Sequence, residues 1–402
     1  MGLQSSTVRR GSDVPRDFWL VWQGQLVSQV GTQAFQVLAL FWLASNTQHA
    51  GAGALFLALS LLPPVLAGPF LARWSARFAP RSVMVVCDLS AALLALPVLG
   101  AVLWGAQVST VVVMLLVSNT LLALTHALMM PTVHATVPAL VDGAALPAAN
   151  GWLQTTQQVS SVVGQALGGL AYAAVGPAGL CAANMAGFAL SGLCATRLRS
   201  PAACDKPVGI VRPPAPWALL RSNVALRDLT IVSAVFNVLY APWLVLLPFH
   251  LAALGAPDAT TMGLVLASYG VGSLIGNLGL AKYLRELKPR TLWRALVVMA
   301  LALMLLGQTA SAVQTSLVLV LMGAGIGLVN VQIMTRLQLS VEPGERAGAI
   351  AVMRSGVHVA TPFGYGIVAL AQHSIGVAPA TIFTSCGLAL LCALAGMRRL
   401  LR

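Results

Sequence analysis

The stretch of sequence that decides the fold begins at residue 82 and reads SVMVVCDLSAALLALPVLGAVLW to residue 104. It opens a run of 115 residues, between Arg81 and Arg197, that contains no Lys and no Arg. A membrane-spanning helix needs about 20 mostly apolar residues, so this run has room for four such helices with short turns between them. The sequence therefore predicts that this part of the chain crosses a membrane four times.

Four other stretches also lack Lys and Arg. They lie between Arg16 and Arg73, Arg227 and Lys282, Arg294 and Arg336, and Arg354 and Arg398. Each has room for two membrane-spanning helices, which brings the predicted total to twelve. Because every stretch holds an even number of helices, all the basic patches fall on one side of the membrane. Cytoplasmic loops are enriched in Lys and Arg, so we expect that side and both termini to be cytoplasmic, in a bacterial inner membrane.

The composition agrees with an integral membrane protein. Hydrophobic residues make up 58% of the chain, charged residues 8%, and the mean hydropathy is +0.85. The net charge of +13 comes from basic residues at the ends of apolar spans, which indicates contact with lipid headgroups and no nucleic-acid partner. The six cysteines have no zinc-site spacing, so we expect neither a metal site nor a cofactor.

The chain divides into two six-helix halves, which predicts an all-α membrane protein with internal pseudo-symmetry. Residues 18–197 form the predicted N-terminal half and residues 227–398 the C-terminal half. The proline- and charge-rich residues 198–226 are predicted to be a cytoplasmic linker, residues 1–17 a cytoplasmic N-terminal segment and residues 399–402 a cytoplasmic tail. The predicted spans are 18–44, 51–72, 82–104, 109–131, 147–174, 177–197, 227–252, 260–284, 291–309, 313–336, 347–372 and 376–398.

A short sequence repeat supports the two halves. Residues 68–82 read GPFLARWSARFAPRS and residues 276–291 read GNLGLAKYLRELKPRT. Each begins with a glycine predicted to end a helix, carries a basic cluster, and has a Pro-Arg step before the next predicted span. Repeated halves with a binding cavity at their interface are typical of secondary transporters, which move one half against the other.

The first of these segments resembles the loop signature of the major facilitator superfamily. Four other stretches resemble its branch of macrolide-efflux proteins and the enterobactin exporter. They are WQGQLVSQVGTQAF (Trp22–Phe35), AANGWLQTTQQVSSVVGQALGG (Ala148–Gly169), GLVLASYGVGSLIG (Gly263–Gly276) and RLQLSVEPGERAGAIAVMR (Arg336–Arg354). The resemblance covers most of the chain and implies a proton-coupled exporter of a small organic molecule.

The sequence departs from the family pattern in that loop and in the first span. Ala76 stands where the family has an Asp, before the expected Arg77, and Thr32 replaces an Asp that often follows the glycine in the first span. Ala72 and Gln165 replace a frequent glycine and proline. The resemblance makes Gly68, Arg77 and Arg81 candidates for a gating latch. We hypothesise that Asp88 replaces the missing loop Asp by pairing with Arg77 or Arg81.

Two polar stripes indicate a solvated path. Gln25, Gln29, Thr32 and Gln36 fall on one face of the first predicted helix. The fifth predicted helix repeats the pattern with Asn150, Gln154 and Gln157, together with Ser161 and Gly168. Amides at membrane depth are costly against lipid, so these side chains should face either a wet cavity or a neighbouring helix. Glycine pairs such as Gly164/Gly168, Gly272/Gly276 and Gly323/Gly327 predict close helix packing.

The ten acidic residues all map to predicted loops, termini or helix ends, so no carboxylate is expected at the bilayer midplane. The candidates for a proton relay are instead His126, His358 and Arg354, since histidine titrates near neutral pH. For each histidine, a role in helix packing is the favoured alternative.

Further polar and aromatic residues suit a bulky, partly apolar cargo. The candidates are Asn237, Tyr240, Tyr269, Asn330 and Tyr365, beside the amide stripes and His126. We therefore predict an exporter, without enzyme activity, of a siderophore, a macrolide-type drug or another metabolite, acting as a monomer in the lipid bilayer with the proton as coupling ion. An importer of the same fold and a transport-inactive membrane partner or sensor remain alternatives.

Overall fold

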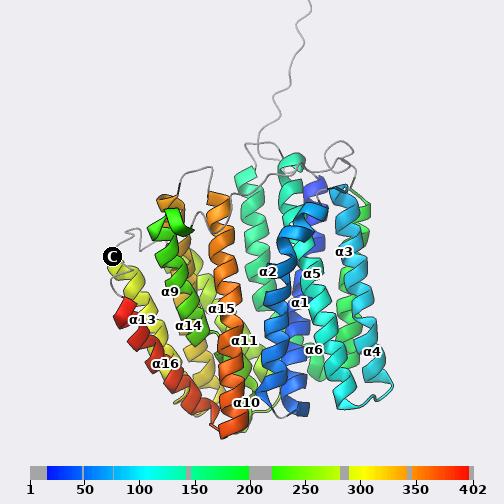
Figure 1. Cartoon of the computed structure of the whole chain (residues 1–402). Helices are drawn as coiled ribbons and strands as arrows, with labels where there is room; N and C mark the ends of the chain where they lie inside the picture. The colour runs from blue at the N-terminus through cyan, green and yellow to red at the C-terminus, as the bar shows by residue number, and fades with distance from the viewer. Residues whose placement is uncertain are drawn as a thin grey trace, which may run out of the picture.

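The computed structural model describes residues 16–47, 49–75, 77–141, 146–198, 220–280, 289–341 and 346–397. Every regular element in this part of the chain is a helix, and the helices stand side by side in one bundle (Figure 1). The predicted segments 1–17, 198–226 and 399–402 lie largely or wholly outside the described residues. The first half contains α1 (Arg16–Thr47), α2 (Ala50–Ser75), α3 (Pro80–Leu94), α4 (Leu96–Leu103), α5 (Val108–Leu140) and α6 (Leu146–Thr196).

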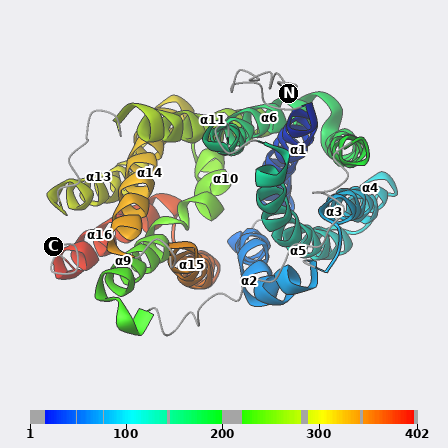
Figure 2. The same ribbon diagram turned by 90° about the horizontal axis from the view of Figure 1, so that it is seen from above.

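The second half repeats this arrangement on the other side of the molecule (Figure 2). Its elements are α9 (Val224–Tyr240), α10 (Trp243–Ala253), α11 (Ala259–Leu274), the π-helix η1 (Ile275–Leu280), α13 (Pro289–Leu306), α14 (Ala312–Ser340), α15 (Arg346–Ile375) and α16 (Pro379–Gly396).

These elements give twelve membrane passes. Nine candidate spans in the described residues are long and apolar enough to cross a membrane. One of them, Thr155–Thr196, is 42 residues long and holds two passes, because α6 breaks at Gly176, where φ is 67°, before Pro177. The apolar helix Leu292–Leu306 and the 30-residue α15 supply the remaining two. Large apolar side chains on the outer face of α15, such as Phe363 and Ile367, are exposed, as expected of a helix in contact with lipid.

Several predicted spans differ in detail from the observed helices. The span 82–104 is two helices, α3 and α4, because Pro97 cannot donate a backbone hydrogen bond to the preceding turn. The span 227–252 is divided in the same way at Pro242. The span 109–131 ends nine residues too early, since α5 continues to Leu140. Gly68 does not end a helix as predicted, because α2 continues to Ser75.

Helix pairing follows the same pattern in both halves. The first pass of each half packs on the fifth, the second on the fourth and the third on the sixth; in the second half these are the pairs α9 with α15, α11 with α14, and α13 with α16. Between the halves, the second pass of each packs on the fifth pass of the other, α2 on α15 and α11 on α6. The short sequence repeat therefore corresponds to a repeated packing scheme.

Glycines allow several of these pairs to approach to backbone contact. An added Cβ at Gly168 would lie 2.7 Å from Ala34 Cα, and one at Gly327 would lie 2.5 Å from the carbonyl oxygen of Ser273. The packing role predicted for the small-residue pairs is confirmed at these positions. In lipid, where water does not drive helices together, such close van der Waals contact is a main source of helix association.

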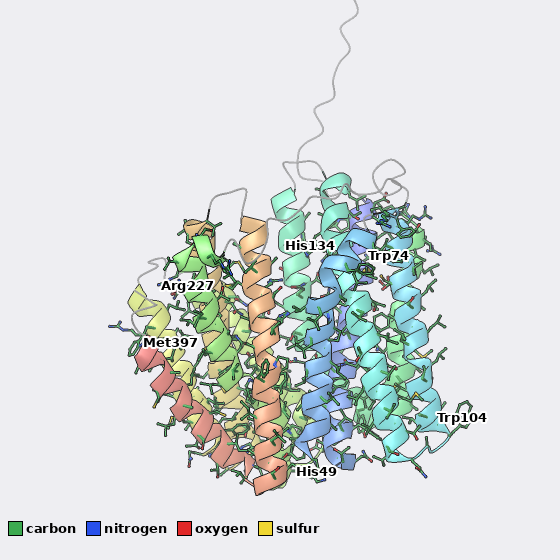
Figure 3. All side chains as sticks on the ribbon, in the orientation of Figure 1. His49, Trp74, Trp104, His134, Arg227 and Met397 are labelled. Atoms are coloured by element: carbon green, nitrogen blue, oxygen red, sulfur yellow. The ribbon has the colours of Figure 1, made fainter. Side chains whose placement is uncertain are left out.

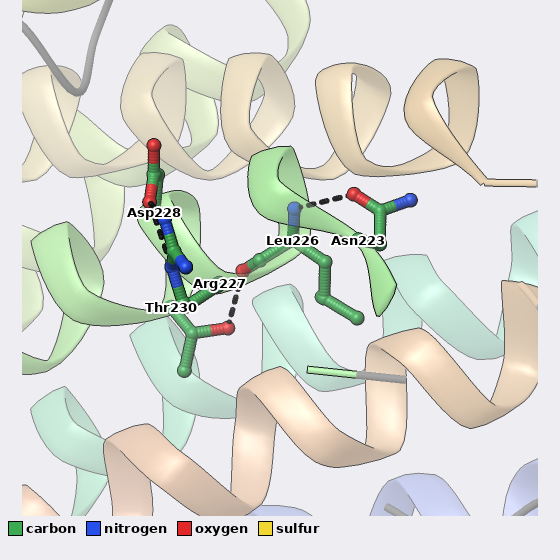
Figure 4. Close-up of polar contacts among 5 residues, drawn as sticks. All are labelled: Asn223, Leu226, Arg227, Asp228 and Thr230. Carbon is green, nitrogen blue, oxygen red and sulfur yellow. Dashed lines mark hydrogen bonds and ion pairs between the residues drawn. The ribbon is translucent and has the colours of Figure 1, made fainter. Parts of the chain in front are cut away.

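The second half begins at a capped helix (Figure 4). The side chain of Asn223 accepts a hydrogen bond from the backbone N–H of Leu226 at 2.9 Å and donates one to the carbonyl of Ser340 at 2.8 Å. It thereby caps α9 and ties it to the end of α14. Arg227 and Asp228 form an ion pair at 3.2 Å, at the surface of the same helix turn.

The two ends of the bundle differ in charge. We call the end that carries Trp74 and Arg227 the basic end, where Arg77 donates its backbone N–H to the carbonyl of Trp74, and the end that carries His49 and Trp104 the opposite end (Figure 3). At the opposite end the two halves meet directly. The backbone N–H of Ala50 donates to Gln372 Oε1 at 2.8 Å, and the rings of His49 and His373 lie edge to face with centroids 4.7 Å apart.

Substituting Ala for Gly327 should destabilise the fold, whereas Ala at Gly366 should not. A Cβ at Gly327 would collide with α11, and such overpacking costs about 1–3 kcal/mol. No atom lies within 4 Å of a Cβ at Gly366, so G366A gains helix propensity without a collision. We expect a lower thermal unfolding midpoint in detergent for G327A alone; equal midpoints for the two variants would contradict the packing described.

Candidate functional site

Two adjoining cavities are lined by described residues in the interior of the bundle. The larger, of about 560 Å³, is formed mainly by the second half, and we call it the C-half cavity. The smaller, of about 370 Å³, is formed by the first half, and we call it the N-half cavity. His358 on α15 contributes to the lining of both, so the two cavities adjoin at this side chain.

The C-half cavity combines amides with apolar side chains. Asn237 and Asn277 donate hydrogen bonds to the carbonyl of Ser233 at 2.9 Å and to Ser273 Oγ at 3.4 Å. Asn330 on α14 is exposed to the cavity. Its described lining is Gln157, Gln158, Val232, Ser233, Phe236, Asn237, Asn277, Leu296, Ile326, Val329, Asn330, Val331, Ile333, Met334, Thr335, Met353, Arg354, Val357 and His358.

Gln157 and Gln158 reach this cavity from α6, so both halves contribute to it. Arg354 is the charged side chain of the described lining, and it lies close enough to His134 on α5 and to His358 to interact with both electrostatically. A cargo in this cavity would therefore contact both halves at once.

The N-half cavity is lined by hydroxyls, amides and aromatic rings. Asn119 donates to the carbonyl of Phe56 at 2.8 Å and to Ser60 Oγ at 3.0 Å. Its described lining is Ser28, Thr32, Gln33, Phe35, Gln36, Phe56, Ser60, Leu61, Pro64, Cys87, Asp88, Ala91, Asn119, Leu122, Ala123, Thr125, His126, Ala127, Met129, Asn184, Phe188 and His358.

The position of Asp88 differs from two sequence-based expectations, its place at a helix end and its pairing with Arg77 or Arg81. It lies inside α3, is 3% exposed and lines the N-half cavity, so this acidic residue is buried within a membrane span and not at a helix end. Its Oδ2 accepts a hydrogen bond from Ser191 Oγ at 2.8 Å. No ion pair joins it to Arg77 or Arg81 among the described residues, and Arg81 donates to the carbonyl of Thr196. The predicted pairing is therefore absent from this conformation, and a latch through Asp88 stays a prediction. Sequence reasoning counted Asp88 as a helix-end residue because it follows the basic loop by only seven positions.

The polar stripe of α1 is divided between two environments. Thr32 and Gln36 line the N-half cavity, whereas Gln25 is buried and lies beside Asp88 in a void of about 10 Å³. Gln29 donates to Gln25 Oε1 at 3.4 Å, so these two amides contact each other and line neither main cavity. Both residues belong to α1, so this bond is neither the predicted contact with a main cavity nor a bond to a neighbouring helix.

The other predicted residues are placed as follows. Gln157, Asn237, Asn330, His358 and Arg354 line the C-half cavity, and His126 lines the N-half cavity. Tyr240 stacks on Phe236 with ring centroids 4.8 Å apart, Tyr269 contacts Trp243 at 5.0 Å, and Tyr365 is buried. These three tyrosines belong to the core that supports the cavities. The side chains of Asn150 and Gln154 and the loop position Ala76 lie outside the described residues.

Sequence reasoning missed Asn119, Asn184 and Asn277. Each is a lone amide in an otherwise apolar span, so none forms part of a stripe. The signal that could have found them is the cost of a polar group at membrane depth, applied to single residues.

Comparison with known proteins identifies the fold family. Residues 21–365 match the family model described as Major Facilitator Superfamily. Macrolide efflux protein A of Streptococcus pyogenes is 25% identical over 266 residues; the match covers 65% of each chain, so it spans a little less than two thirds of that relative. Among solved structures, a bacterial homologue of the iron transporter ferroportin in its inward-facing state has a TM-score of 0.74 at 18% identity, covering 96% of this chain and all of that one.

A second structural neighbour, the POT family transporter PepTSo, also has a TM-score of 0.74, at 11% identity, with 96% of this chain and 98% of that one covered. At these identities the structures establish the fold alone. The family match spans most of the chain, and the resemblance to the superfamily and its macrolide-efflux branch is confirmed. With twelve passes in two repeated halves and two adjoining interior cavities, the chain belongs to the Major Facilitator Superfamily.

Proposed function

We propose that this chain is a secondary active exporter that moves a bulky, partly apolar organic molecule across a bacterial cell membrane. The observation that carries the proposal is the pair of adjoining cavities, lined by amides, hydroxyls and apolar side chains contributed by both halves. Such a lining suits a large amphiphilic cargo better than a sugar phosphate or a dicarboxylate, which require clustered Arg or Lys. The similarity to a macrolide efflux protein supports a macrolide-type drug as the first cargo to test.

Transport would proceed by alternating access. We assign the basic end, with both termini, to the cytoplasm, because Lys and Arg are enriched on that side. The contacts of Ala50 with Gln372 and of His49 with His373 then close the outer end, and the described conformation faces the cytoplasm. Export would require these contacts to break while the halves close at the basic end.

A proton gradient would supply the energy. His126 and His358 both line the cavities, which supports them as the residues that would exchange the proton. Arg354, which stays charged, lies near His358 and would act in the relay through its charge. A siderophore or another secondary metabolite of similar size fits the same lining and is a second class of cargo within this function.

The export proposal is tested in a bacterial host that lacks its own macrolide pumps. Expression should lower the cellular accumulation of radiolabelled erythromycin, and dissipating the proton gradient should abolish the difference. Asn330→Trp places a ring in the C-half cavity and should reduce export by about tenfold or more, equivalent to losing about 1.4 kcal/mol of binding. Accumulation that rises on expression would indicate an importer instead.

A matched control is available on the same helix. Leu321 lies nine residues from Asn330, on the opposite and lipid-exposed face of α14, so Leu321→Trp adds the same ring away from the cavity and should leave export unchanged. If erythromycin is not exported, mass spectrometry of medium and cells from iron-starved cultures tests the siderophore. A cargo found in neither experiment would favour a transport-inactive partner or sensor.

Locking the outer end should stop transport. In a chain whose native cysteines are replaced, His49→Cys and His373→Cys together should be joined by a short bifunctional maleimide, because the native rings are in contact. Cross-linking should abolish export, whereas the two single variants treated in the same way should remain active. Export that continues after complete cross-linking would contradict alternating access through this end.

A further inference from the structure

The two cavities differ in the sign of their charge. The N-half cavity contains Asp88, and its described lining includes no Lys or Arg. The C-half cavity contains Arg354, and its described lining includes no Asp or Glu. Because His358 lies where they adjoin, a single cargo can extend from a negative compartment into a positive one.

The Asp88 carboxylate has no cationic partner among the described residues, where the recorded ion pair joins Arg227 to Asp228. It is 3% exposed, and the hydrogen bond from Ser191 reaches only its Oδ2. A carboxylate within a membrane span is costly unless another charge or a proton compensates it. The site therefore favours a positive charge delivered from the cavity that Asp88 lines.

Asn184 gives a second, independent indication of a ligand. It is 3% exposed and lines the same cavity, yet neither Oδ1 nor Nδ2 has a hydrogen-bond partner within the described structure. Gly31 makes room for it, since an added Cβ there would lie 2.5 Å from Asn184 Oδ1. Buried amides are normally paired, so an unpaired one facing a cavity points to a polar group that the cavity receives.

The remaining lining favours an organic cation over an inorganic one. Phe35, Phe56 and Phe188 contribute rings to a cavity of about 370 Å³, far larger than a single ion needs. Calcium and magnesium ions prefer six or more oxygen ligands, usually with several carboxylates, and this cavity offers one carboxylate. Aromatic faces, by contrast, attract ammonium groups and pack against their substituents.

We propose that the N-half cavity is a cation subsite that receives the protonated amine of an amphiphilic cargo. Asp88 supplies the opposite charge, the Asn184 carbonyl accepts a hydrogen bond from the ammonium group, and the phenylalanine rings contact its substituents. The acceptor-rich part of the cargo extends past His358 toward Arg354. This inference rests on the proposed export function and names its substrate class. Because Asp88 supplies the opposite charge, the site should bind cationic molecules in preference to neutral ones.

The test measures binding by the purified full-length protein in detergent. The probes are two fluorescent dyes of similar size, the cation ethidium and the neutral Nile red. Asp88→Asn should weaken ethidium binding by about tenfold, while Nile red binding changes less than about twofold. The control is Asp258→Asn, which makes the same chemical change at a helix cap on the opposite end, where Asn caps as well as Asp, and should change neither affinity.

Asn184→Asp tests the proposal in the other direction. It adds a second carboxylate to the same cavity and should strengthen ethidium binding by about fivefold, a gain that misfolding cannot produce. Unchanged ethidium binding in D88N, or a native protein that binds Nile red but not ethidium, would overturn the cation subsite. Asp88-dependent ethidium binding, with export of neither erythromycin nor a siderophore from cells, would leave the subsite standing and refute the export proposal.

Discussion

The hydrocarbon interior of a membrane offers no hydrogen-bond partner to backbone N–H and C=O groups, and this constraint shapes every level of the molecule. It requires helices throughout the membrane-spanning region, as the described residues show. It also makes polar side chains costly at the lipid-facing surface, so several of them lie in the interior of the bundle. Asp88, Asn119, Asn184 and Asn330 all line the two cavities, while Phe363 and Ile367 face outward. The cost of a polar group in lipid thus explains both the helical backbone and the position of these polar side chains at the cavities.

The internal repeat determines how that place can open. The second pass of each half packs on the fifth pass of the other. The halves are therefore joined by two equivalent helix contacts, α2 with α15 and α11 with α6, which we call seams. At the end that carries His49, the polar and ring contacts recorded between the halves among the described residues are one hydrogen bond, from Ala50 to Gln372, and one pair of rings, His49 and His373. Contacts of this kind contribute little individually, on the order of 1 kcal/mol each. Binding a cargo across both halves can therefore shift the balance between closed and open ends.

Much of the fold could be predicted from where Lys and Arg are absent, because charge is costly in lipid over any stretch long enough to cross it. Helix ends were less predictable. Pro97 and Pro242 divide helices inside apolar runs that read as continuous, and α5 extends beyond its apolar part. For the site, periodic stripes led to Thr32, Gln36 and Gln157 but also to Gln25 and Gln29, which bond to each other. Partner choice between neighbouring amides depends on packing, which a pattern along one helix does not contain.

The seam between α6 and α11 has a mechanical consequence. At Gly169 and Gly263 the two backbones touch, and an added Cβ at Gly169 would lie 2.9 Å from Gly263 Cα. Interlocked side chains would have to leave one groove and enter another before the halves could turn, which makes such interfaces switch between discrete arrangements. No side chains interlock where Gly169 faces Gly263, so at this point the two halves could turn against each other without such a step. Val162, which packs against Gly270 in the same seam, is a side chain that would have to move.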